Sequence, residues 1–252
     1  MSAGDFDYDA RGQGYALRRR PDPRIAAHVH EALGDARTVL NVGAGAGSYE
    51  PDDRYVLAVE PSAQMRAQRP AGAAPAVQAV AQQLPFDDGA FDAVMAMVTV
   101  HQWPDKDAGL RELRRVARGT VVVMSFDPDA LDHFWLAQYA PELIEAESKR
   151  YPSIADFQQI LGGEFASKVV PIPIDCTDGF TEAFYARPEQ LLDAAVRGAQ
   201  SAWAFVDRAD ESRAVDELAA DLESGRWDER FGGLRRQPFY EGSLRLIISH
   251  HS

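Results

Sequence analysis

The amino-acid sequence predicts an α/β fold built on a mostly parallel, doubly wound sheet with helical insertions. In the first half of the chain, short Val-rich apolar runs alternate with segments whose apolar residues recur at helical spacing. The first of these runs ends in a cluster of glycines, as a strand does where it turns into a ligand-binding loop. After residue 126 the pattern changes to long helical stretches, so the sheet is expected to be interrupted by insertions.

Short apolar runs of the kind found in buried strands define the expected sheet. They are residues 38–42, 55–59, 76–80, 91–100, 120–124, 169–174 and 244–248. Helical spacing predicts one helix that ends before Gly34 and another that follows Asp105. Ser62 is expected to be the N-cap of a short helix after the second strand.

We expect a single domain over residues 1–252. Its parts are an N-terminal arm and helix (1–35), a ligand-binding core (36–127), a helical cap (128–166 and 181–236) and closing strands (167–180 and 237–252). With 46% hydrophobic residues, the chain can bury a core of this size.

Charge and cysteine content exclude several classes of protein. Thirty-nine acidic against 26 basic residues give a net charge of −13, which disfavours nucleic acid and anionic membranes as partners. The single cysteine, Cys176, rules out a disulfide framework, and no metal-ligand motif is present. The chain begins polar and no apolar run reaches 18 residues, so we expect a cytoplasmic protein without a membrane span.

The glycine cluster is the most informative stretch. Gly43, Gly45 and Gly47 follow the first expected strand, where glycine permits tight turning and a close approach of a ligand to the backbone. The peptide N–H groups there favour an anionic group; the alternative is a tight turn without a ligand. A dinucleotide loop has a glycine or alanine at the position of Ser48, so the spacing argues against nicotinamide and flavin cofactors.

Glu60 is the second indication of a nucleoside site. It ends the second expected strand, thirteen residues after Gly47. A carboxylate at this place can accept hydrogen bonds from both ribose hydroxyls. The alternative is a solvated surface glutamate, the usual environment of this residue type.

Several motifs in order resemble those of class I S-adenosylmethionine-dependent methyltransferases. They are V-L-N-V-G-A-G-A-G, A-V-E-P-S, Q-Q-L-P-F-D-D-G-A-F-D-A-V, H-Q-W-P-D and L-R-E-L-R-R-V-A-R. The sequence is most similar to the small-molecule branch that includes ubiquinone- and menaquinone-biosynthesis enzymes, and the resemblance covers residues 8–126. It implies a Rossmann-like seven-stranded sheet, S-adenosylmethionine as cofactor and S-adenosylhomocysteine as product.

The resemblance also implies a set of cofactor-binding residues. They are Tyr8, Tyr15, Arg19, Asn41, Gly43, Ala44, Gly45, Gly47, Glu60, Pro61, Ser62, Ala81, Gln82 and Met97. By this likeness the glycines approach the methionine and ribose parts, and Glu60 holds the ribose. Ala81 and Gln82 line the adenine, Met97 lies below the methionine part, and the N-terminal arm closes over the carboxylate through its tyrosines and Arg18 or Arg19.

Two positions depart from the family pattern. Asn41 stands where an acidic residue usually precedes the first glycine, so it brings no charge to the cofactor's ammonium group. Val80 stands near the place of an acidic residue that contacts the adenine amine, and its side chain cannot accept a hydrogen bond. Both departures predict weaker cofactor binding, while the backbone cradle is retained.

His101 and Asp127 are the candidate catalytic residues, since each follows a strand at the carboxyl edge of the sheet. His101 could act as a base, because its reference pKa is near neutral, or could simply wall the pocket together with Trp103. Asp127 could bind or deprotonate the acceptor, or could cap the helix that begins at Pro128.

Other residues of the second half leave two interpretations open. Its aromatic side chains could line an acceptor pocket or pack between cap helices; they are Phe134, Trp135, Tyr139, Phe184, Tyr185 and Trp203. Asp175 and Asp178 could contact a polar acceptor or make Asx turns.

The sequence therefore predicts an enzyme that methylates a small organic acceptor by in-line displacement, at carbon, oxygen or nitrogen. A non-catalytic protein that binds S-adenosylmethionine or S-adenosylhomocysteine, as a regulator or partner subunit, is one alternative. An NAD(P)-dependent oxidoreductase is another, and the position of Gly47 argues against it.

Overall fold

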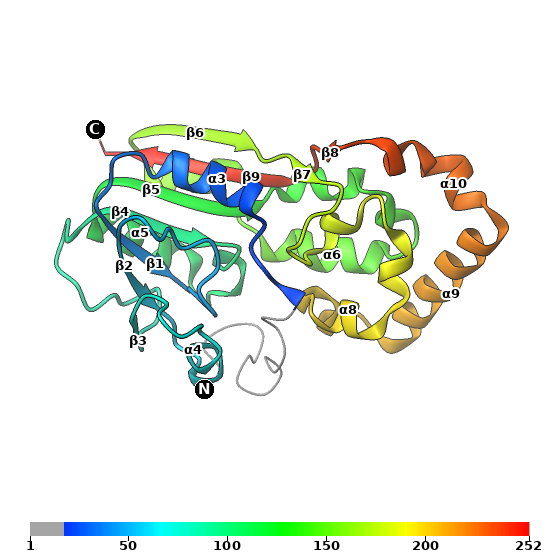
Figure 1. Ribbon diagram of the computed structural model, residues 1–252, viewed down its shortest axis with the longest axis horizontal. Helices are drawn as coiled ribbons and strands as arrows, with labels where there is room; N and C mark the ends of the chain where they lie inside the picture. Colours follow the sequence, from blue (N-terminus) through cyan, green and yellow to red (C-terminus); the bar gives the residue numbers. More distant parts are fainter. Residues whose placement is uncertain (1–17, 252) are drawn as a thin grey trace.

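A computed structural model describes residues 18–251 and contains a seven-stranded sheet with a helical region at one end (Figure 1). The sheet order is β3-β2-β1-β4-β5-β9-β6. The strands are β1 (Thr38–Val42), β2 (Tyr55–Val59), β3 (Ala76–Val77), β4 (Phe91–Met97), β5 (Ala117–Phe126), β6 (Glu164–Val169) and β9 (Leu244–His250). Strands β1 to β5 pair in parallel, and β9 runs antiparallel between β5 and β6. The predicted fold class is confirmed.

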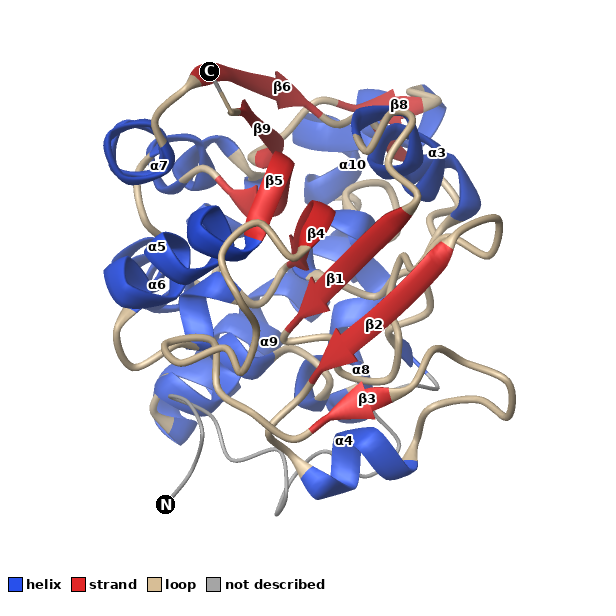
Figure 2. Cartoon of the chain, turned by 90° about the vertical axis from the view of Figure 1, so that its left-hand side faces the viewer, coloured by secondary structure: helices blue, strands red, loops and turns tan. Residues whose placement is uncertain are grey.

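Helices cover both faces of the sheet because its central strands alternate apolar side chains between two cores. Val39 packs in one core with α3 (Pro23–Ala32), and Leu40 packs in the other with α5 (Lys106–Val116) and α7 (Ile154–Leu161). Figure 2 shows the sheet between α5 and α7 on one side and α3 on the other. The β1–β2 connection contains no helix, so the glycine loop leads directly to the second strand.

Side-chain caps set the starts of two helices near the site. The Ser62 hydroxyl accepts a hydrogen bond of 3.1 Å from the Met65 amide and begins α4 (Ala63–Ala67), as predicted. Asp22 is fully buried and accepts a bond of 3.0 Å from the Arg24 amide at the start of α3. These caps place α4 and α3 at opposite ends of the chain segment that carries the glycine loop.

A helical cap lies beyond the carboxyl ends of β4 and β5 (Figure 1). Its elements are η2 (Pro128–His133), η3 (Trp135–Gln138), α6 (Pro141–Arg150), η4 (Thr181–Phe184), η5 (Pro188–Leu192), α8 (Ala194–Gly198), η6 (Ser201–Phe205), α9 (Arg208–Ser224), α10 (Arg226–Phe231) and η7 (Gly232–Arg236). All six aromatic residues with two open interpretations are buried in the core that continues from the sheet into the cap. The structure thus favours packing over acceptor binding for this set.

Three strand boundaries differ from the sequence prediction. Strand β6 begins at Glu164, inside the stretch predicted to be helical to residue 166. The prediction missed the strand because this edge strand is exposed at most positions and carries no continuous apolar run. The run predicted at 169–174 is divided between the end of β6 and the short β7 (Ile172–Pro173), which pairs with β8 (Phe239–Tyr240). Pro171 and Pro173 have no amide hydrogen to continue a ladder.

Two further differences lie at strand ends close to the glycine loop. Strand β3 is only two residues long, and Val80 forms an isolated bridge with Gln83 instead of extending it. Strand β4 ends at Met97 because Val98 adopts a left-handed φ of 50°, which cannot continue a strand.

Within residues 18–251, no helix is long and apolar enough to cross a membrane. The same part of the chain holds no group of three His, Cys, Asp or Glu side chains placed to share a metal ion.

Two helical glycines should respond to alanine substitution with opposite signs. A Cβ on Gly109 in α5 would lie 2.4 Å from the buried Trp103 ring, whereas a Cβ on Gly198 in α8 would meet nothing within 4 Å. We expect Gly109→Ala to lower the free energy of unfolding by about 1–3 kcal/mol through overpacking. Gly198→Ala should raise it by about 0.5–1 kcal/mol through helix propensity. Urea denaturation measures both; equal effects would contradict the Trp103 contact.

Candidate functional site

The glycine loop makes a backbone cradle at the end of β1. Gly43, Gly45 and Gly47 adopt positive φ angles of 68°, 53° and 99°. A Cβ on Gly43 would lie 2.2 Å from the Thr99 hydroxyl oxygen, so no side chain fits there. The Gly43 and Ala44 amides donate to the Val59 carbonyl at 2.9 and 3.0 Å, which ties the turn to β2. The loop therefore presents backbone, not side chains, to the space above it.

This loop lines a pocket at the carboxyl ends of β1, β2 and β4, which we call the glycine-loop pocket. Its lining residues are Asn41, Gly43, Ala44, Gly45, Ala46, Ser48, Glu60, Met65, Met97, Val98, Thr99 and Gln102. Six residues of the predicted cofactor set are among them. In open α/β sheets, ligands bind at this edge.

Glu60 connects the glycine loop to the start of α4. It is 7% exposed, and its two carboxylate oxygens accept hydrogen bonds of 2.8 Å from the amides of Gly45 and Ser62. The carboxylate is therefore held in one position at the edge of the pocket, where a sugar diol could share it. This placement favours the ribose interpretation over a solvated surface glutamate.

The carboxylate of Glu50, which the sequence did not point to, explains the amide at position 41. Asn41 Nδ2 donates to Glu50 Oε1 at 3.0 Å, and Arg69 Nη2 holds both Glu50 oxygens at 3.0 and 2.8 Å. A second carboxylate at position 41 would face Glu50 directly, whereas the amide donates to it. Asn41 Oδ1 is buried without a hydrogen-bond partner among the described residues, so it remains available to a ligand donor.

Of the remaining predicted cofactor residues, those that the structure describes do not line the pocket. Ser62 caps α4, and Pro61 accepts a hydrogen bond from Arg66 through its carbonyl. Gly47 lies at the outer side of the loop, where a Cβ would be 3.2 Å from Glu50. Tyr8 and Tyr15 lie outside the described residues.

The segment predicted to line the adenine is turned partly away from the pocket. Ala81 is 5% exposed and packs in the apolar core under α5. Gln82 donates through Nε2 to the Asp105 carbonyl at 3.3 Å, and Val80 is 38% exposed. Their contacts with a cofactor stay predictions.

A second pocket lies between the sheet and the helical cap, and we call it the cap pocket. Its lining residues are Arg19, Val98, His101, Gln102, Phe126, Glu147, Tyr151, Phe180, Thr181, Gln200 and Ser201. Val98 and Gln102 line both pockets, so the two spaces are neighbours at the end of β4. Arg19 was predicted to reach the cofactor carboxylate; the structure places it at the cap pocket.

His101 is a buried wall of the cap pocket. It is 4% exposed, and its ring centroid lies 4.6 Å from that of Tyr151. Burial, followed by the nearby charge of Arg150, holds the pKa of His101 well below its usual 6.5. The imidazole is therefore neutral at neutral pH, and its Nδ1 has no hydrogen-bond partner among the described residues. Its role as a base stays a prediction.

Asp127 is committed to structural contacts. Its carboxylate accepts a hydrogen bond of 3.2 Å from the Asp129 amide at the start of η2 and forms an ion pair of 3.2 Å with Arg245. It lines neither the glycine-loop pocket nor the cap pocket. The geometry favours capping over a part in the chemistry.

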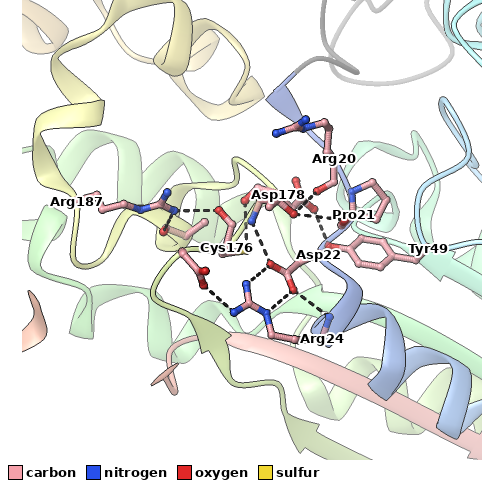
Figure 3. A network of polar contacts seen from close by, with 11 residues as sticks. Arg20, Pro21, Asp22, Arg24, Tyr49, Cys176, Asp178 and Arg187 are labelled. Carbon is pink, nitrogen blue, oxygen red and sulfur yellow. Dashed lines mark hydrogen bonds and ion pairs between the residues drawn. The ribbon is translucent and has the colours of Figure 1, made fainter. Parts of the chain in front are cut away.

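A buried network joins the chain segment before α3 to the end of the glycine loop and to the loop after β7. Asp178 is 3% exposed and accepts hydrogen bonds from Arg19 Nε at 2.5 Å and from the Tyr49 hydroxyl at 2.7 Å. Tyr49 follows the glycine loop and has a positive φ of 63°. Figure 3 shows Tyr49 and Asp178 beside the capping pair of Asp22 and Arg24. Of Asp175 and Asp178, Asp178 is thus structural, and Asp175 forms an ion pair of 2.7 Å with Arg24.

A larger groove lies beside α3 at the other edge of the sheet. Asp92 and Thr120, near the amino ends of β4 and β5, line it. Ligands of open α/β sheets bind at the carboxyl ends of the strands. The glycine-loop pocket and the cap pocket are therefore the candidate site, although they are smaller.

Comparison with known proteins relates part of the chain to methyltransferases. Residues 40–124 match the family model described as "Methyltransferase domain". Over 128 residues the chain is 33% identical to demethylmenaquinone methyltransferase of Mycolicibacterium vanbaalenii, covering 50% of this chain and 52% of that protein. The chain thus matches about half the length of such curated relatives, and the matched part includes the glycine loop.

Solved structures extend the likeness to the cap. The chain resembles a putative methyltransferase from an antibiotic biosynthesis pathway of Anabaena variabilis, with 27% identity and a TM-score of 0.84 over 92% of this chain and 98% of that one. A possible histamine N-methyltransferase of Thermotoga maritima shares the fold, with 19% identity and a TM-score of 0.52 over 66% of this chain and 84% of that one.

Glu60→Gln should weaken the binding of S-adenosylhomocysteine. The amide would present N–H groups to at least one of the two backbone donors that the carboxylate now satisfies. We expect a loss of about 1–3 kcal/mol, a 5- to 150-fold higher Kd in calorimetry. Glu31→Gln, on the exposed side of α3, is the control and should bind as the unchanged protein does. An unchanged Kd for Glu60→Gln would place Glu60 outside the site.

Asn41→Asp should destabilise the fold, and more so at higher pH. The new carboxylate would lie beside Glu50, which raises its folded-state pKa above the unfolded value. Stability is then lost as pH rises through that range. We expect about 1–3 kcal/mol at pH 8 and a smaller loss at pH 5, measured by urea denaturation. A loss that is equal at both pH values would exclude repulsion from Glu50 as its cause.

Proposed function

We propose that the chain is a class I S-adenosylmethionine-dependent methyltransferase and that it transfers a methyl group to a small organic acceptor. The observation that carries this proposal is the pair of neighbouring pockets that share Val98 and Gln102. One has the backbone cradle and the carboxylate that suit the cofactor. The other is walled by the cap and suits an acceptor held close to the transferred group.

The residues of the glycine-loop pocket fit the proposed cofactor. A cradle that excludes any Cβ at Gly43 lets the cofactor approach the backbone, and Glu60 offers acceptors for a ribose diol. The unpartnered Asn41 Oδ1 can accept from a donor such as an ammonium group. S-adenosylmethionine supplies a methyl group on a positively charged sulfur, so the leaving group needs no further activation.

The protein's part in the reaction is then positioning and the exclusion of water. Val98 and Gln102 stand at the boundary where acceptor and methyl group would meet in line. Buried groups at the ends of β4 and β5, such as His101 and Phe126, wall the acceptor side beneath the cap. A neutral His101 can orient an acceptor by a hydrogen bond without adding charge beside a cationic donor.

The small size of the acceptor is supported by the enclosure of the cap pocket and by the net charge of −13, which disfavours nucleic acid. The matched curated relative is named demethylmenaquinone methyltransferase. Methyl transfer to carbon, oxygen or nitrogen would each fit this geometry.

Cofactor choice can be tested with S-adenosylmethionine, S-adenosylhomocysteine, NAD and NADP in a thermal-shift panel. Ligand at 100 times its Kd stabilises by about 2.7 kcal/mol, or roughly 5–10 °C in Tm for a chain of this size. We expect shifts with the first two ligands alone. A shift with NAD or NADP instead would contradict the proposal. Radiolabelled methyl transfer to a panel of small acceptors then separates an enzyme from a non-catalytic binder.

A further inference from the structure

One face of α6 turns polar side chains into the cap pocket. Glu147, Arg150 and Tyr151 are spaced i, i+3, i+4, so they share one side of the helix end, and each is 8% exposed. Glu147 and Tyr151 line the cap pocket, and Arg150 donates to the Ser201 hydroxyl at 3.1 Å. This side of α6 faces His101 and Phe126 at the ends of β4 and β5. A carboxyl group is thereby placed in the same pocket as the boundary residues Val98 and Gln102.

Among the residues that the structure describes, none donates a hydrogen bond to the Glu147 carboxyl group or forms an ion pair with it, and the charges that act on it are those of Arg150, Glu182 and Arg19. Buried carboxyl groups are normally satisfied, and Glu182 shows how: both its oxygens accept from the Ser243 amide at 3.0 Å. Burial raises the pKa of Glu147 to about 7, with Arg150 and Arg19 opposing and Glu182 reinforcing the rise. A group so costly to bury and left without a partner fits a site awaiting a ligand.

Gln200 supplies a complementary unpartnered donor to the same pocket. Its Oε1 accepts from the Thr181 hydroxyl at 3.0 Å and from the Trp203 indole at 3.3 Å. Because an indole nitrogen can only donate, the amide orientation is settled, and Nε2 is left buried without a partner among the described residues. Among the described residues, the cap pocket thus presents an unpartnered hydrogen-bond acceptor at Glu147, an unpartnered donor at Gln200 and the neutral ring of His101.

We propose that the cap pocket takes an acceptor whose nucleophile carries a proton, an O–H or N–H group, and that Glu147 receives this proton. This inference rests on the proposed methyl transfer. The acceptor's heteroatom would donate to Glu147, and a neighbouring oxygen or nitrogen of the acceptor would accept from Gln200. As the heteroatom–carbon bond forms, the carbon–sulfur bond breaks, its electron pair goes to sulfur, and the proton goes to the carboxylate and then to water.

A stability measurement tests the unpartnered carboxylate without an acceptor. The folded-state pKa of about 7 exceeds the ordinary 4.5, so wild-type stability should fall as pH rises between these values. Glu147→Gln removes that loss. We expect its Tm to exceed that of the wild type by about 7–13 °C at pH 8 and by much less near pH 5. The control is Glu145→Gln, on the exposed side of α6, with an unchanged Tm. A lower Tm for Glu147→Gln at pH 8 would show a structural carboxylate and overturn the proposal.

Methyl transfer tests the chemistry with three probes: 4-methylcatechol for O–H, benzylamine for N–H, and thioanisole, whose sulfur carries no proton. We expect transfer to a protic probe, with kcat at least about 100-fold lower in Glu147→Gln and unchanged in Glu145→Gln. The KM for S-adenosylmethionine and the Kd for S-adenosylhomocysteine should not change. The wild-type kcat should increase with pH through about 7, and this increase should be absent in the Glu147→Gln variant. Transfer to thioanisole alone, or an equal kcat in Glu147→Gln and Glu145→Gln, would overturn this inference. If the wild type does not bind S-adenosylhomocysteine, the proposed function is overturned instead.

Discussion

The buried carboxylate of Asp178 is the interaction on which the arrangement of the site depends. It comes from the loop after β7, yet it holds Arg19 from the segment before α3 and Tyr49 from the end of the glycine loop. Separating the Asp178 carboxylate from either donor is costly, because the buried charge would lose a hydrogen bond in a medium of low dielectric. The sheet and the loops beneath the cap are thereby held in register, and the two pockets keep a common wall.

Strained backbone lies in that wall and just after the glycine loop. Tyr49 and Val98 are non-glycine residues with positive φ angles, and for a β-branched side chain such as Val98 this conformation is rare. Val98 is nevertheless held by a hydrogen bond of 2.8 Å from its amide to the Met124 carbonyl. The turn ends β4 early and exposes backbone where both pockets meet. Strain at such a place is typical of a functional site.

Local signals made the glycine-loop pocket predictable from sequence. A strand that ends in glycines and a second strand that ends in Glu60 follow from period and residue type alone, and the parallel sheet then brings them together. The contacts that complete the cradle were not predictable. Thr99 against Gly43 and Glu50 against Asn41 depend on how distant or irregular segments pack. Glu147 gave no signal, because a glutamate in an amphipathic helix normally faces solvent, and exposed β6 lacked the apolar run that marks a strand.

A crystal structure with bound S-adenosylhomocysteine tests the central claim most directly. The account predicts the ribose hydroxyls within hydrogen-bond distance of Glu60 and the sulfur facing the boundary formed by Val98 and Gln102. The cap pocket would then open directly onto that sulfur. A ligand bound in the groove beside α3, or one whose sulfur is separated from the cap pocket, would contradict the account.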